Sequence, residues 1–291
     1  MADRTNATAD ARAPTATRAG LLRPEQFAQH VDLHRWVPDP VAQRWVENYW
    51  ALAWDLPEGR SFLSETLPHP TCSLTAEHAT HPRPGVGDDP VVVTGVVTRR
   101  FEVVTQGRAR VFGVKFRPGG LVALVGGRAR DWTDRVVAAR AVVPPRLRDA
   151  LAEHDLDDGL DGAPPVIDEV IASLRPAHDD DTYDRVLAVI ADMLGDRTLL
   201  SVGQVEERHE VSARTLQRWF TSYVGVGPKW VLARYRMHDA VSELDAGYAG
   251  SLTDLATRYG WFDQAHFTRD FVDLVGVTPG AYRSRPSRGT S

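Results

Sequence analysis

The feature that most constrains the fold is an internal repeat near the C-terminus. A shift of 51 residues places Leu216 on Phe267, Arg218 on Arg269 and Phe220 on Phe271. It also aligns Gly225-Val226 with Gly276-Val277, and Pro228 with Pro279. A shift of 50 aligns Val202 with Leu252 and Val205 with Leu255. Because the apolar residues have helical spacing, each unit is predicted to be a short helix, a tight turn, a second helix and a Gly-Val-x-Pro segment.

The second helix of each unit has one apolar and one polar face. Ser212 and Asp263 are typical N-cap residues, and the aromatic and leucine side chains that follow them share one face. The opposite faces carry arginine, which binds guanine, and glutamine, which binds adenine. For one such helix, an ordinary solvent-facing surface would be a sufficient explanation. The repetition of the same polar face in both units favours DNA binding instead. The predicted DNA-binding residues are Ser212, Arg214, Gln217, Arg218, Asp263, Gln264, His266 and Arg269.

A longer helix is predicted between the units. It begins at Pro228, which suits a first helical turn, and its buried stripe comprises Trp230, Ala233, Met237, Ala240, Val241 and Leu244. Arg234, Arg236 and, after the second unit, Arg283 are candidate phosphate contacts. For Arg234 and Arg236 a plain solvent-facing role is an equal alternative.

These segments resemble AraC/XylS-type transcription regulators. The resemblance rests on residues 252–271 (LTDLATRYGWFDQAHFTRDF), 276–283 (GVTPGAYR) and 212–220 (SARTLQRWF). It implies a bacterial transcription activator or repressor with a seven-helix DNA-binding domain. Two recognition helices, at about 212–224 and 263–275, would enter successive major grooves of promoter DNA. It also implies that an N-terminal domain senses a signal, dimerises, or both.

The first unit departs from this family pattern. Glu206 and Glu210 stand where the family usually has a small residue and a turn glycine, the types kept by their repeat mates Ala256 and Gly260. Gly203 weakens the first helix by about 1 kcal/mol relative to alanine. Acidic side chains near phosphate oppose binding. The second unit is therefore expected to contribute more affinity.

The first half of the chain is dominated by predicted strands. Short segments rich in valine, threonine and aromatics lie between Gly- and Pro-containing turns, at 46–54, 72–76, 91–97, 101–105 and 110–116. The segment 121–126 is ambiguous between strand and helix. Overall we predict an α+β chain of two domains, a β-rich, cupin-like barrel or sandwich followed by an all-α domain. The expected divisions are a disordered leader (1–20), a sensor or dimerisation domain (21–148), an acidic linker with a short helix (149–182), an AraC-type DNA-binding domain (183–286) and a tail (287–291).

Composition narrows the cellular setting. The net charge is −5, yet residues 183–291 carry equal numbers of acidic and basic side chains, so DNA binding requires arginines gathered on one face. No long apolar run or secretory signal is present, and Cys72 is the only cysteine. A cytoplasmic protein without membrane association is expected. Cys72, flanked by apolar strand residues, is expected to be a buried small hydrophobe rather than a redox sensor.

The N-terminal domain carries weaker functional signals. Tyr49 to Pro68 and Gly113 to Gly120 resemble a compact β-rich domain found ahead of AraC-type modules, although Pro68-His69-Pro70 departs from its usual Pro-Asp-Gly. Trp45, Tyr49, Trp50 and Trp54 are a candidate effector pocket, with core or dimer interface as the alternative. His69, His78 and His81 raise the alternative of a metal site, but loop or surface histidines are the favoured interpretation, and no metal or other cofactor is predicted.

Other classes of protein fit less well. The sequence has no phosphate-binding glycine loop, hydrolase elbow or metalloprotease motif, so no enzyme is predicted. A DNA-repair alkyltransferase would need a reactive cysteine in a defined motif, which Pro70-Thr71-Cys72-Ser73 does not provide. The remaining alternative is a protein-interaction module, or a degenerate regulator with weak DNA binding and a metal- or ligand-binding domain. Further partners are compatible with the sequence: RNA polymerase, a small-molecule effector, and a second copy of the chain in a homodimer.

Overall fold

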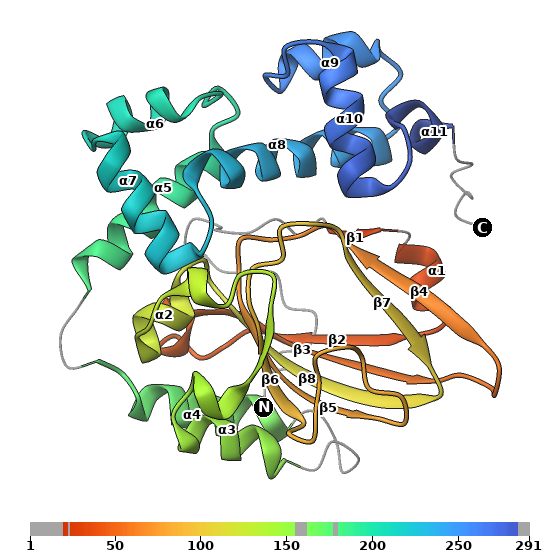
Figure 1. Ribbon diagram of the computed structural model, residues 1–291, viewed down its shortest axis with the longest axis vertical. Helices are drawn as coiled ribbons and strands as arrows, with labels where there is room; N and C mark the ends of the chain where they lie inside the picture. The colour runs from red at the N-terminus through yellow and green to blue at the C-terminus, as the bar shows by residue number, and fades with distance from the viewer. Residues whose placement is uncertain (1–19, 23, 155–161, 177–179, 285–291) are drawn as a thin grey trace.

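A computed structural model describes residues 20–22, 24–154, 162–176 and 180–284. A β-rich N-terminal domain lies beneath a C-terminal domain of helices (Figure 1). Nearly all of the predicted leader, the parts of the acidic linker at 155–161 and 177–179, and the predicted tail lie outside the described residues. None of the helices in the described part of the chain is both long and apolar enough to cross a membrane.

The N-terminal domain contains two antiparallel sheets. The larger has the order β2-β3-β8-β5-β6-β9 and the smaller β1-β4-β7. Their strands are β1 (Leu21–Leu22), β2 (Asp32–Trp36), β3 (Val46–Asp55), β4 (Ser61–Thr66), β5 (Ser73–Ala79), β6 (Val91–Thr94), β7 (Phe101–Gln106), β8 (Arg108–Phe116) and β9 (Val136–Ala138). All five predicted strands are present. The ambiguous segment is helix α2 (Gly120–Val125).

Short helices accompany these sheets. They are α1 (Pro24–Ala28), η1 (Ala42–Arg44), η2 (Ala129–Asp131), η3 (Ala139–Ala141), α3 (Pro145–Ala152) and α4 (Ala163–Ser173). The helix predicted within the acidic linker is α4, which packs back on the N-terminal domain. There the buried carboxylate of Asp168 accepts a hydrogen bond from the Tyr49 hydroxyl at 2.8 Å.

The C-terminal domain has seven α-helices within residues 180–284, as the family resemblance implied. They are α5 (Asp181–Gly195), α6 (Val202–His209), α7 (Ala213–Trp219), α8 (Pro228–Asp245), α9 (Leu252–Arg258), α10 (Gln264–Val275) and α11 (Pro279–Arg283). A π-helical turn, η5 (Phe220–Val224), extends α7. Asp180 caps α5, since its side chain accepts hydrogen bonds from the backbone N–H groups of Thr182 and Tyr183.

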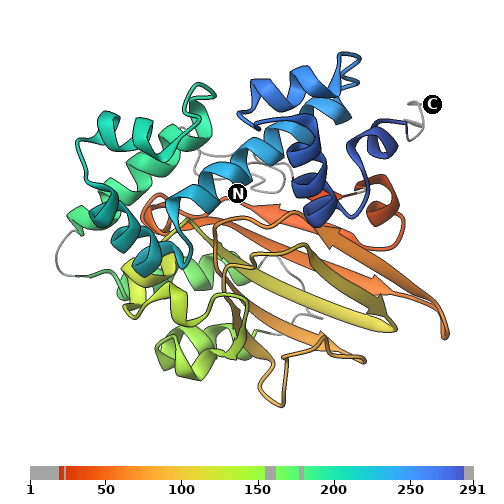
Figure 2. The same cartoon turned by 45° about the horizontal axis from the view of Figure 1, so that its top comes forward.

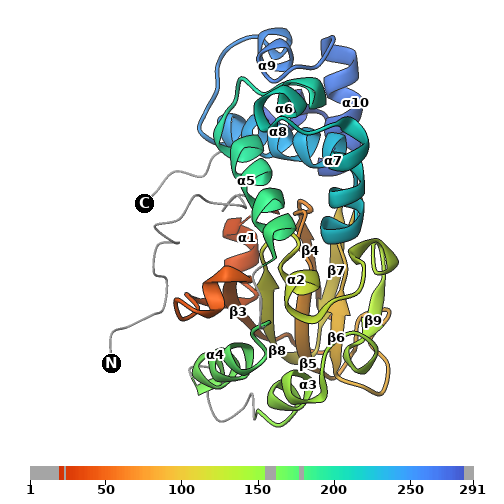
Figure 3. The same cartoon turned by 90° about the vertical axis from the view of Figure 1, so that its left-hand side faces the viewer.

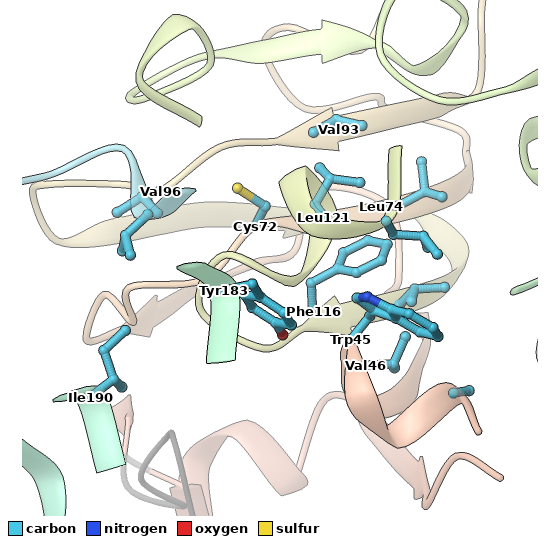
Figure 4. Packing of buried hydrophobic residues seen from close by; sticks show 14 of the residues in the cluster. Trp45, Val46, Cys72, Leu74, Val93, Val96, Phe116, Leu121, Tyr183 and Ile190 are labelled. Atoms are coloured by element: carbon cyan, nitrogen blue, oxygen red, sulfur yellow. The ribbon is translucent and has the colours of Figure 1, made fainter. Parts of the chain in front are cut away.

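One apolar core continues from the N-terminal domain into the first helical unit. Tyr183 of α5 is completely buried, and its hydroxyl donates to the Arg44 carbonyl at 2.9 Å. Figure 4 shows Tyr183 near Phe116 and Cys72, with Ile190 of the same helix further along. The prediction for Cys72 is confirmed, since burial raises the pKa of its thiol to about 12. A second cluster joins Leu22 and Leu67 to the second unit.

The N-terminal domain also contacts the end of the second helix in each of the two repeated units, at carbonyls one position apart in the repeat. The Thr133 hydroxyl donates to the carbonyl of Gly225 at 2.9 Å, and the Arg100 guanidinium donates to the carbonyl of Val275 at 3.2 Å. Gly225 and Gly276 are the left-handed C-caps that end η5 and α10. The ends of both second helices are therefore fixed to the N-terminal domain through main-chain atoms.

Candidate nucleic-acid interface

Each unit presents its second helix in the same way. Helices α7 and α10 lie at opposite ends of α8, on the same side of it (Figures 1 and 3). Ser212 caps α7 by accepting the Thr215 N–H, and Asp263 caps α10 by accepting the His266 N–H at 2.7 Å. Both predicted caps are confirmed. They fix where each helix begins, and therefore which side chains its first turns expose.

The apolar faces of these helices anchor them in the core as predicted. Leu216 and Phe220 are fully buried in the first unit, as are Phe267 and Phe271 in the second. Trp219, Tyr223 and Leu274, the remaining members of the predicted faces, are partly buried against the same clusters. Since the anchored faces hold both helices rigidly, the opposite faces point consistently outward.

The outward faces carry the predicted polar set. Arg214, Arg218 and Arg269 are exposed, and no hydrogen bond or ion pair engages them among the residues that the structure describes. His266 lies 3.4 Å from the Asp270 carboxylate, an ion pair only when the imidazole is protonated. The free guanidinium groups are available to an external acceptor, and arginine forks match guanine edges and phosphate oxygens.

The two glutamines have internal partners that the sequence analysis did not anticipate. Gln217 donates to the Thr221 hydroxyl at 3.1 Å, and Gln264 accepts from the Thr253 hydroxyl at 2.8 Å. The first contact could have been predicted from the sequence, because Gln217 and Thr221 are four residues apart in one helical segment. The second joins α9 to α10 and has no local signal in the sequence.

The phosphate-contact predictions need correction for Arg234. Its side chain is buried, stacks at 4.4 Å over the Trp230 ring and donates to the Thr98 carbonyl at 3.2 Å. Burial lowers the pKa of its guanidinium to about 10. A group enclosed between two domains cannot reach a DNA backbone from this conformation.

Arg236 and Arg283 are also tied to main-chain oxygens. Arg236 is partly buried and donates to the Leu200 carbonyl, which joins α8 to the segment before α6. Arg283 is exposed and donates to the Gly250 carbonyl at 2.8 Å. Arg236 is better explained as a link within the domain, whereas Arg283 keeps an exposed side chain near the second unit.

For the candidate effector pocket, the structure favours the alternative interpretation, a core position, at two of the four aromatics. Trp45 and Tyr49 are core residues with 3% and 0% exposure. Trp50 packs against Gly113, and Trp54 donates to the Gln106 carbonyl at 3.3 Å. A cleft of about 510 Å³ lies elsewhere, between β1, α1 and β2 on one side and Val241 and Asp245 of α8 on the other, and none of the four aromatics lines it.

The histidines predicted to be loop residues do not form a metal site. His69 packs against His238 of α8, with ring centroids 4.6 Å apart, while His78 and His81 are exposed. No group of three or more potential metal ligands comes together within the described ranges.

The two helix-turn-helix units, each with exposed arginines on its second helix, are typical of a DNA-binding domain. Residues 206–285 match the family model of a helix-turn-helix domain, so the C-terminal part of the chain is a helix-turn-helix domain of the AraC type. Residues 34–138 match a domain of unknown function, DUF6597. No curated protein matches the chain.

Solved structures of ToxT from Vibrio cholerae are among those that match the chain. One from strain O395 has a TM-score of 0.36 at 8% identity, covering 83% of this chain and 99% of that one. A structure of ToxT bound to an unsaturated fatty acid has a TM-score of 0.35 at 11% identity, covering 94% and 98%. Similarity this low carries no weight in assigning the function.

Proposed function

We propose that the chain binds promoter DNA as a two-part clamp, with α7 and α10 in successive major grooves. The observation that carries this is the equivalence of Arg218 and Arg269. They occupy matching positions of the repeat, both are exposed, and neither has a partner within the described residues. Grooves on one face of a duplex recur at about 34 Å, so two helices on one rigid body engage one turn apart.

The polar set supports both base and backbone contacts. Arg218 and Arg269 suit guanine, while Gln217 and Gln264 suit adenine once their hydroxyl partners are exchanged for base atoms. Arg214 and His266 extend each surface along its helix. Ser212 and Asp263, both exposed residues, contribute by capping the two helices.

The two units are proposed to contribute unequally. Glu210, an exposed residue two positions before the cap of α7, has Gly260 as its equivalent in the second unit, and the partly buried Glu206 has Ala256. Negative charge there opposes phosphate. The second unit is therefore the stronger contributor to affinity.

Footprinting on DNA upstream of the gene, followed by titration of the protected site, tests this proposal. Arg269→Ala is expected to weaken specific binding by roughly 1–3 kcal/mol and to relax one base position. Arg218→Ala should act in the same direction with a smaller loss. The double variant, once shown to be folded, should lose a salt-sensitive footprint of about two helical turns.

Arg185→Ala is the matched control, because Arg185 is an exposed arginine of the same domain that lies on α5. Unchanged affinity in Arg269→Ala would contradict the groove assignment. A larger loss in Arg218→Ala would reverse the order of the two units. Equal weakening by all three variants would indicate general charge attraction, as in a degenerate regulator.

We also propose that the N-terminal domain, expected at about 21–148, modulates this binding. Support comes from its contacts with the carbonyls of Gly225 and Val275, which end the two recognition helices. A shift of the N-terminal domain would alter the relative placement of α7 and α10, and hence their fit to two grooves. The cleft beside α8 is a place where a small molecule could bias that shift.

A further inference from the structure

Phe262, in the turn between α9 and α10, has an unusual exposure. Its side chain is 91% accessible, the highest value among the large apolar residues that the structure describes; the next is Val104 at 57%. Single exposed apolar residues are common on protein surfaces. Phe262 differs from such residues in its position, because it directly precedes the cap of α10, one of the two helices proposed to bind DNA.

The fold makes no use of the Phe262 ring. An apolar residue just before the N-cap usually packs against the fourth helical residue, here Phe267, and fixes the entry of the chain. In this unit Trp261 takes that role, with its ring centroid 4.9 Å from that of Phe267 and its indole N–H donating to Asp270 at 2.8 Å. Trp261 is 7% exposed, so the anchor is complete without Phe262.

The first unit provides an internal comparison. Val211 occupies the equivalent position, directly before the cap Ser212. It is partly buried and packs against the core cluster that contains Leu216, the counterpart of Phe267. The same place in the repeat therefore holds an inward residue in the first unit and an outward aromatic in the second.

The direction of α10 determines what Phe262 faces. Its C-terminal end is held by Arg100 at the Val275 carbonyl. At 1.5 Å per residue, Phe262 lies about 20 Å further along, at the end remote from that contact. Its neighbours Gln264 and His266 are exposed residues of the proposed DNA surface.

We infer that Phe262 is a specificity-determining residue that contacts the 5-methyl group of a thymine in the major groove; this rests on the proposed function. Thymine alone among the four bases presents a methyl group there, and phenylalanine is one of the side chains that contact it. Burying the ring against that methyl removes apolar surface of both from water. The second unit would then read thymine beside the bases bound by Gln264 and Arg269.

The test combines a protein variant with removal of the methyl group. Wild-type protein and Phe262→Ala are titrated against the footprinted site in which each thymine is replaced in turn by deoxyuridine. For the wild type, one replacement should weaken binding about fourfold, the equivalent of one buried methyl-sized group. Phe262→Ala should bind the thymine site more weakly and show no sensitivity to that replacement.

Val104→Ala is the control, because Val104 is an exposed apolar residue of β7, far along the chain from the interface; it should bind both sites like the wild type. Equal loss in Phe262→Ala on thymine and uracil sites would mean contact with the sugar–phosphate backbone and would overturn the inference. Wild-type affinity in Phe262→Ala, with the Arg269→Ala loss intact, would overturn it too and would direct attention to a protein partner such as RNA polymerase. Absence of any footprint from wild-type protein would remove the proposed function and this inference together.

Discussion

Glu210 shows how one residue departs from the conformation that its side chain prefers. It is the left-handed C-cap of α6, with φ 49° and ψ 43°. Its repeat mate Gly260 has φ 78°, a region open to glycine at no steric cost. The sequence comparison identified the missing turn glycine, and the structure shows that the turn kept its geometry. The first unit therefore carries local strain that the second avoids.

Replacing Glu210 with glycine should stabilise the protein. Left-handed conformation costs a side-chain-bearing residue roughly 1–2 kcal/mol, and greater freedom of the unfolded chain returns part of that. Glu210→Gly is expected to raise the free energy of unfolding by about 0.5–1 kcal/mol, measured by urea denaturation. Glu207→Gly, within the helix, should lower it by about 1 kcal/mol. A midpoint below wild type for Glu210→Gly would show that the glutamate is not strained.

Among the elements, α8 is the helix whose buried residues differ most clearly from the stripe predicted by its sequence. Four of the six predicted stripe residues are buried, but Ala233 is exposed and Trp230 is partly so. Val231, Leu232, Arg234, Tyr235 and His238 are buried in addition. Figure 2 shows the reason: α8 runs between the two helical units and above the sheets, so more than one face is covered. A single helical period cannot reveal a second covered face.

The strands show a similar limit. Segments rich in valine and aromatics, such as β3 and β8, could be predicted from sequence. The polar segments β2 and β4 could not, because they form strands by pairing with β3 and β7 rather than through their own composition. The caps and the exposed polar faces of α7 and α10 could be predicted because repeat and capping are local signals. Burial of Arg234 and Trp45 depends on residues distant in the chain.

The buried position of Arg234 leads to a prediction about salt. A residue that neutralises a phosphate contributes about one unit to the slope of log affinity against log salt. Arg234→Met should leave that slope unchanged in DNA titrations at several salt concentrations. Its Nε and Nη1 atoms are buried without hydrogen-bond partners in the described structure, so methionine should also preserve the unfolding midpoint. A slope reduced by about one would restore Arg234 as a phosphate contact.

At the scale of the whole molecule, His238 joins the two domains. It is fully buried on α8, and its Nε2–H donates to the Pro68 carbonyl at 3.0 Å. His69 packs on its ring. Burial lowers the pKa of His238 to about 4; the hydrogen bond to Pro68 opposes this shift, and the positive charges of Arg234 and Lys115 add to it. The junction therefore requires a neutral imidazole.

This lowered pKa predicts how stability changes with pH. Between an unfolded pKa of about 6.5 and the folded value of about 4, the unfolded chain binds the proton and the folded chain does not. The contribution of neutral His238 is thus complete above about pH 6.5 and is lost as pH falls toward 4. His238→Gln keeps an N–H donor without a proton to gain. Urea denaturation across this range should show a steeper loss for wild type than for the variant, and parallel curves would refute the assignment.

The N-terminal domain holds the ends of the recognition helices through carbonyl oxygens, those of Gly225 and Val275, which every amino acid possesses. Substitutions on the outward faces therefore leave intact the hydrogen bonds that link the helices to the rest of the protein. If α7 and α10 bind DNA as proposed, the choice of target and the link to the N-terminal domain can change independently in descendants of such a gene. An engineer could likewise exchange outward side chains while keeping that link.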